Sequence, residues 1–279
     1  MAVPPPIDPE HFHPHSPDQP LPPPPPLAMA PEVPKYSAVD LLDVLLIAVA
    51  GFFSLILAAA FASIVLYLVR YPRAFNPKEL SNNALFVIPT QVAAYLLIVS
   101  FMALLVWIRH NQNLSQAIHW NLPAERLGLL ALGAGGLMGL CSEVASTLLQ
   151  PWTPKSLPIE EFFKTPASGY LLAAFGVLVA PLVEELFFRG FLYPALERWT
   201  GATTSIIITA AAFASMHGAQ LAYAWAPLMV LFGVGLVLTI IRAKSGSVAT
   251  CVIVHMGYNL TLFILLFFVT GGFHHMERA

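Results

Sequence analysis

Charged side chains are scarce in this chain of 279 residues. Only 10% are Asp, Glu, Lys or Arg, whereas a soluble domain carries roughly 25%. The sequence is 57% hydrophobic, and its mean hydropathy is +0.73. This composition predicts an integral membrane protein, with the lipid bilayer as its main contact. The formal net charge is −2 and no basic face is clustered, which argues against nucleic acid as a partner.

Cysteine is also rare. Cys141 and Cys251 are the two cysteines of the chain, and both lie far apart within apolar runs. A disulfide framework is therefore not implied. We expect both to be small, buried apolar side chains.

The apolar runs are long enough to cross a membrane as helices, which takes about 20 residues each. They predict an all-α fold, a polytopic membrane helix bundle of about seven transmembrane helices. Eight is the alternative, because the first run is long. The runs are 41–69, 84–108, 127–149, 169–193, 203–217, 221–241 and 247–270.

The first 38 residues differ from the rest because they contain poly-proline and no apolar periodicity. Such a segment cannot bury a core, so we expect residues 1–38 to form a disordered, proline-rich arm. The transmembrane helices then begin at about residue 39.

The fourth run contains "APLVEELFFRGF", in which three ionisable side chains interrupt an apolar helix. A charge at the centre of a membrane span costs about 2.5–3.5 kcal/mol unless it is paired or faces a cavity. Glu185 and Arg189 are four apart and predict an intrahelical ion pair. Glu184 lies about 100° around the helix from Glu185, so it can face the bundle interior and act as a general base.

Two later runs carry further polar pairs with the same spacing. Phe213 and His217 share a face in "FASMH", and His255 and Asn259 share a face in "HMGYN". A histidine beside an amide supplies two hydrogen-bond donors, which can hold an oxyanion. If the chain turns near Gly201, Glu184 and His217 lie at nearly the same depth, 17 residues before and 16 after the turn.

Two other features are less specific. Glu143 in the third run is interpreted as a partner for Arg189 or a histidine, as part of a substrate path, or as structural. The small residues "GAGG" at 133–136 are typical of close helix packing rather than of a phosphate loop, because no strand precedes them.

Together, "EELFFR", "FASMH" and "HMGYN" resemble the CPBP family of intramembrane proteases, which includes the type II CAAX prenyl endopeptidases and the Abi-type proteins. The family pattern is EExxxR, then FxxxH, then HxxxN or HxxxD, and all three motifs occur here in that order. The resemblance implies a CPBP-like catalytic helix bundle at 151–279, with a motif core at about 167–270. Residues 39–150 would then form the N-terminal transmembrane helices.

The resemblance also implies roles for the polar residues. Glu184 would activate water, His217 would help to hold it, and His255 with Asn259 would form the oxyanion hole. Glu185, Arg189 and Phe213 would support the site, and no metal or other cofactor would be required. The location implied is the bacterial inner membrane, with the active site and the N-terminus at the cytosol.

Other readings of the same residues remain open. Glu184, His217 and His255 are plausible zinc ligands, which would make the protein a zinc-dependent hydrolase. A non-catalytic membrane scaffold or immunity protein would retain the fold, and a proton-coupled transporter would use the acids and histidines as relays. The expected substrate is a membrane protein or lipidated peptide. Neither its identity nor the oligomeric state can be read from the sequence.

Overall fold

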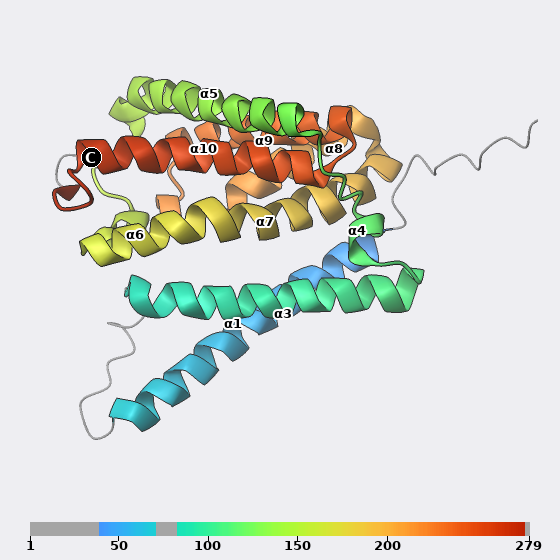
Figure 1. Ribbon diagram of the computed structural model, residues 1–279, viewed down its shortest axis with the longest axis horizontal. Coiled ribbons are helices and arrows are strands. Elements are labelled where there is room, and N and C mark those ends of the chain that lie inside the picture. Colours follow the sequence, from blue (N-terminus) through green and yellow to red (C-terminus); the bar gives the residue numbers. More distant parts are fainter. Residues whose placement is uncertain (1–38, 71–82, 277–279) are drawn as a thin grey trace, which may run out of the picture. The chain divides into compact units, whose positions relative to one another are not determined.

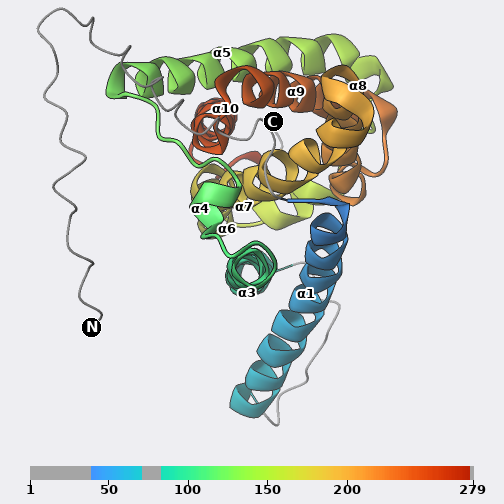
Figure 2. The same ribbon diagram turned by 90° about the vertical axis from the view of Figure 1, so that its right-hand side faces the viewer.

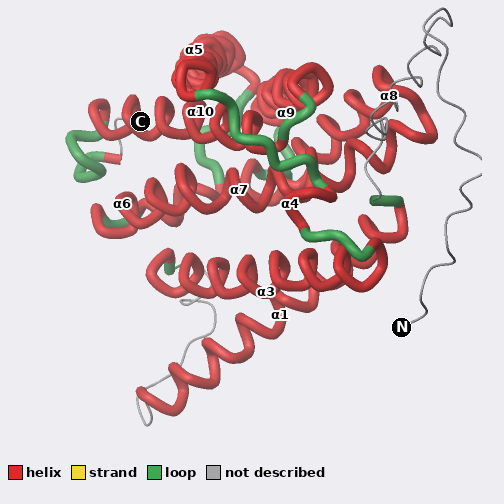
Figure 3. The backbone as a smooth tube through the Cα atoms, turned by 45° about the vertical axis from the view of Figure 1, so that its right-hand side comes forward, coloured by secondary structure: helices red, strands yellow, loops and turns green. Residues whose placement is uncertain are grey.

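The computed structural model describes residues 39–70 and 83–276. The predicted arm at 1–38 lies outside the described residues. The described residues all belong to one compact unit. Within the described ranges the chain is helical and has no strand (Figure 3), so the predicted all-α class is confirmed.

The long helices form because a backbone in lipid must satisfy its polar groups internally. Polar side chains cap several of them: Asn83 accepts a hydrogen bond from the Leu85 amide, and Ser247 accepts one from the Thr250 amide. The helices are α1 (Leu41–Arg70), α3 (Ala84–His110), α4 (Leu114–Ala117), α5 (Glu125–Leu149), α6 (Pro166–Ala174), α7 (Ala180–Glu185), α8 (Tyr193–Met216), α9 (Trp225–Ser245) and α10 (Val248–Val269).

Two π-helical segments interrupt the fourth span. They are η4 (Phe175–Val179), between α6 and α7, and η5 (Leu186–Leu192), between α7 and α8. Pro181 has no amide hydrogen, and the preceding turn widens so that the amide of Ala180 donates to the carbonyl of Phe175. Such widened turns are rare in helices and often lie at functional sites.

Six helical runs among the described residues are long and apolar enough to span a membrane, and one of them, Pro166–Met216, covers 51 residues. This run contains the predicted fourth and fifth spans. It breaks at Gly201, whose φ of 76° is outside the helical region and is accessible to glycine without a Cβ clash. Phe213 packs edge-on against Phe188 with ring centroids 5.3 Å apart, so α8 folds back on η5 as the predicted hairpin requires.

Helices α5 and α10 lie side by side along their lengths (Figure 1). A Cβ on Gly135 would stand 2.0 Å from the Val254 carbonyl oxygen, and one on Gly257 would stand 2.3 Å from that of Leu132. The two backbones therefore touch, which confirms the close packing predicted for "GAGG".

Helix α3 packs against α1 (Figure 2), and an ion-pair cluster joins them at one end. Asp43 is fully buried and lies 2.8 Å from Arg109 Nε and 2.8 Å from His110 Nε2. Asp40 lies 2.9 Å from the Arg109 guanidinium. These contacts fix the start of α1 against the end of α3.

The cysteine prediction is half right. Both thiols are free, and Cys251 is buried, but Cys141 is exposed on α5. Sequence hydropathy could not separate the two, because lipid is as apolar as a protein core and an apolar run therefore does not specify which side faces inward.

Candidate active site

The predicted ion pair of Glu185 and Arg189 is present and lies at the centre of the site. Arg189 Nη1 donates to Glu185 Oε1 at 2.8 Å, and neither side chain is exposed. Arg189 also donates to the Gly235 carbonyl at 3.0 Å and to Thr239 Oγ1 at 3.3 Å. The guanidinium thus ties η5 to α9 while it neutralises the Glu185 carboxylate.

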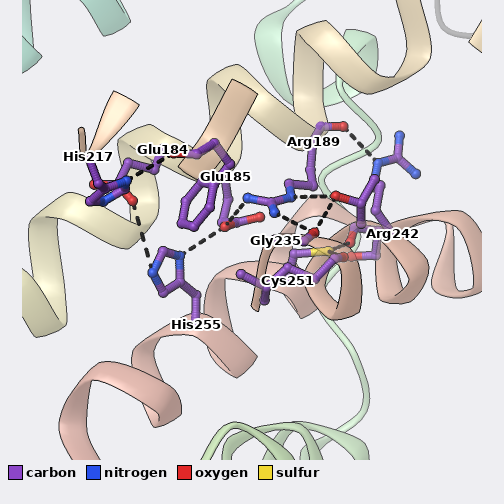
Figure 4. A network of polar contacts seen from close by, with 12 residues as sticks. Glu184, Glu185, Arg189, His217, Gly235, Arg242, Cys251 and His255 are labelled. Atoms are coloured by element: carbon purple, nitrogen blue, oxygen red, sulfur yellow. Dashed lines mark hydrogen bonds and ion pairs between the residues drawn. The ribbon is translucent and has the colours of Figure 1, made fainter. Parts of the chain in front are cut away.

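His255 of α10 joins this pair. Its Nδ1 lies 2.9 Å from Glu185 Oε1, and its Nε2 lies 4.0 Å from Glu184 Oε2. The carboxylate of Glu185 is an acceptor only, so Nδ1 carries the hydrogen of this bond. Nε2 then points to the second carboxylate (Figure 4), and His255 bridges the two glutamates.

Glu184 has a different environment from Glu185, as its place on the helix predicts. Its side chain is 11% exposed and lines a cavity of about 460 Å³. Within the described part of the chain, no hydrogen bond to its carboxylate oxygens is formed, and His255 at 4.0 Å is its ion-pair partner. Glu184 is therefore the carboxylate that is available to water.

His217 lines the same cavity as Glu184, so the two side chains that the spacing predicts to lie at one level face the same space. Its Nδ1 is 2.9 Å from the carbonyl oxygen of Phe213. That oxygen can only accept, so Nδ1 carries the hydrogen and a neutral His217 presents Nε2 as an acceptor. The orientation of the ring is thus set by the helix that bears it.

Phe213 fills the space between the histidines and the guanidinium. Its ring centroid is 5.0 Å from that of His217 and 5.7 Å from that of His255, and Arg189 Cζ lies 4.8 Å above the ring. This supports the position of all three side chains and adds a cation–π contact.

Asn259 lies apart from this cluster. Its Nδ2 donates to the Gly176 carbonyl in η4 at 2.6 Å, and neither Asn259 nor His255 lines the cavity. His255 and Asn259 are four residues apart on α10, as the sequence predicts. The side-chain amide of Asn259, however, donates to the backbone of a neighbouring helix.

Glu143 pairs neither with Arg189 nor with a histidine of the described ranges. It is exposed on α5, and the Arg189 guanidinium is occupied by Glu185. The interpretation of Glu143 as a partner for Arg189 is therefore wrong.

Among the described residues, no group of three or more His, Cys, Asp or Glu side chains is arranged to hold a metal ion.

The cavity also contains polar residues that the sequence analysis missed. Gln91 and Tyr95 of α3 and Gln220 line it, together with apolar side chains of α1 such as Phe52 and Leu55. A signal for the α3 pair exists, because two polar residues four apart in an apolar run share one helix face.

Comparison with known proteins gives one family. Residues 166–261 match the family model described as type II CAAX prenyl endopeptidase Rce1-like. No curated protein and no solved structure was found that matches the chain. The match confirms the resemblance seen in the three motifs, and it supports a membrane-embedded hydrolase of peptide bonds. Residues 166–261, which run from the start of α6 into α10 and contain Glu184, His217 and His255, are thus similar to the Rce1-like type II CAAX prenyl endopeptidase family.

Proposed function

We propose that this protein is an intramembrane protease that hydrolyses peptide bonds in or near the bilayer with a glutamate-activated water. The observation that carries the proposal is the separation of the two adjacent glutamates. Glu185 is fully buried and bound to Arg189 and His255, whereas Glu184 faces a cavity with His217. One carboxylate is thus structural, and the other is available as a base.

In the proposed reaction, a water in the cavity donates one hydrogen bond to Glu184 and the other to Nε2 of His217. Glu184 takes a proton as the water oxygen bonds to the scissile carbonyl carbon. The tetrahedral intermediate then expels the amine, which receives that proton from Glu184 as the C–N bond breaks. The base is regenerated, and the products are a carboxylic acid and an amine.

His255 is proposed to donate to the oxyanion. This role requires His255 to carry a hydrogen on Nε2 as well as on Nδ1. With Nδ1–H directed to Glu185, the second N–H at Nε2 is on the Glu184 side. Asn259 is proposed as the second donor through the amide hydrogen that does not bind Gly176. Donors of this kind stabilise developing charge by about 2.7–4 kcal/mol each.

The substrate is proposed to be a membrane protein or a lipidated peptide, cleaved without a required metal. The proposed location is the bacterial inner membrane, with the site open to the cytosol. Both proposals are supported by the family resemblance.

The test is cleavage of a library of prenylated and unprenylated peptides by the protein reconstituted in membranes. Wild type is compared with Glu184→Gln, and both are assayed with and without a strong chelator. We expect Glu184→Gln to lower the rate by about 10²- to 10⁴-fold, since it removes a general base, and the chelator to have no effect.

Glu143→Gln is the matched control, because it makes the same substitution in the same membrane at an exposed carboxylate. It is expected to leave the rate unchanged. Cleavage by Glu184→Gln at the wild-type rate would refute the assignment of the base. Loss of wild-type activity with the chelator, restored by Zn²⁺, would establish the zinc hydrolase instead.

A further inference from the structure

Gln91 and Tyr95 stand out on α3 because most of the helix around them is apolar. They are four apart, so they share one face, and that face lines the cavity that contains Glu184. Both side chains are half-buried. Polar groups in a membrane span are retained where they face a cavity or a polar partner. Gln91 and Tyr95 face the cavity.

Tyr95 is held in a fixed position. Gln91, Tyr95 and Glu184 all line the same cavity. The Tyr95 ring stacks on Phe175, with centroids 5.7 Å apart and planes 28° apart. Phe175 is the first residue of η4, so the α3 face is anchored on the segment whose Gly176 carbonyl binds Asn259.

The chemistry of the pair suits a peptide backbone. A membrane segment keeps all its backbone N–H and C=O groups paired within its helix, and a peptide bond must leave that helix before water can reach it. Each amide group released in this way costs several kcal/mol unless it finds a partner. An uncharged amide side chain and a phenol provide both donors and acceptors.

We propose that Gln91 and Tyr95 form a subsite that binds the backbone amides of an unwound, apolar peptide segment beside Glu184. The apolar part of the same wall, which includes Phe52 and Leu55 of α1, receives the side chains of that segment. The subsite lies outside the residues of the family match, 166–261, and this inference rests on the proposed protease function.

The kinetic test uses a peptide that wild type cleaves and Glu184→Gln does not. Gln91→Met keeps the size and removes the amide, and Tyr95→Phe removes the hydroxyl and keeps the stack on Phe175. Each is expected to raise KM by about 3- to 10-fold, which corresponds to the loss of one net hydrogen bond, with a smaller change in kcat. Ser100→Ala is the control, because Ser100 is an exposed polar residue on α3 whose hydroxyl donates to the Leu96 carbonyl and which does not line the cavity.

The binding test replaces single backbone amides of the peptide with esters, which removes one N–H at a time. At one position next to the scissile bond, the ester should weaken binding to wild type by about 3- to 10-fold and have little effect on Gln91→Met. An equal loss in both proteins at every position, or an unchanged KM in both variants, would overturn the subsite.

Binding of the same peptides to Glu184→Gln separates the two proposals. The ester effect measured by binding does not need turnover, so it can hold even if Glu184 is not the base. Conversely, if cleavage depends on Glu184 but peptide affinity is unchanged in the Gln91 and Tyr95 variants, the proposed function stands and the proposed subsite is refuted.

Discussion

At the scale of single residues, the site depends on the buried ion pair of Glu185 and Arg189. Removing one partner leaves the other charge buried, which costs several kcal/mol. Glu185 Oε1 accepts hydrogen bonds from both Arg189 and His255. Glu185 Oε2 is buried with no hydrogen-bond partner within the described residues. A charge in this position is tolerated because the guanidinium is fixed 2.8 Å away.

Arg189→Met should therefore destabilise the protein by about 3–5 kcal/mol, since it leaves the Glu185 charge buried and uncompensated. Thermal unfolding in detergent measures the change. The double variant Glu185→Gln with Arg189→Met removes both charges and should recover part of the loss. A single variant as stable as wild type would show that Arg189 does not hold Glu185 in its charged form.

The sequence predicts this part of the site well, because the cost of charge in a membrane and the helical repeat restrict the options. The spacing predicts the ion pair, the different environments of Glu184 and Glu185, and the common level of Glu184 and His217. It does not predict that His255 bridges the two glutamates or that Asn259 binds Gly176. Those contacts depend on the packing of α10 against the fourth span, which spacing within one helix does not determine.

At the scale of helices, α5 and α10 approach each other so closely at Gly135 that a side chain there would collide with the backbone of α10. The Val254 carbonyl occupies the space where a Cβ on Gly135 would stand, whereas a Cβ on Gly133 would meet nothing within 4 Å. The sequence "GAGG" predicts close packing, but it does not say which glycine faces the partner helix.

Gly135→Ala should destabilise the protein by about 1–3 kcal/mol, because the methyl group forces the two backbones apart. Gly133→Ala is the matched control on the same helix and should be neutral or slightly stabilising, since alanine favours helix by about 1 kcal/mol. Both are measured by thermal unfolding in detergent. Equal effects of the two substitutions would contradict the packing of α5 on α10.

The π-helical turns are a feature of the same scale that hydropathy could not reveal. A run of apolar residues looks the same whether a turn has 3.6 residues or more. Pro181 is the local cause that could have been noticed, since it removes one donor from the helix. The effect is to place Glu184 and Glu185 in a short α-helix between two wider segments.

At the scale of the whole molecule, the helices predict the topology. The run Pro166–Met216, one of six candidate spans among the described residues, breaks at Gly201, and we predict that its two parts cross separately, which gives seven crossings. An odd number of crossings puts the start of α1 and the end of α10 on opposite sides of the membrane.

Reporter fusions test this arrangement. A fusion at Asp40 is expected to be active in the cytosol, and one after Val269 on the other side, because the family resemblance supports a cytosolic site and N-terminus. A fusion at Gly201 should report the same side as one at Asp40, since four crossings separate them. Identical sides for Asp40 and Val269 would mean that the second half of α8 does not cross.

The residues that line the cavity affect how such a protein can evolve. The groups proposed for chemistry lie within the family match, whereas Phe52, Leu55, Gln91 and Tyr95 come from α1 and α3 outside it. Substitutions at Phe52, Leu55 or Gln91 alter the shape and polarity of the cavity wall without changing the residues proposed for acid–base chemistry. Substrate preference and catalytic power can therefore diverge independently in descendants of this chain.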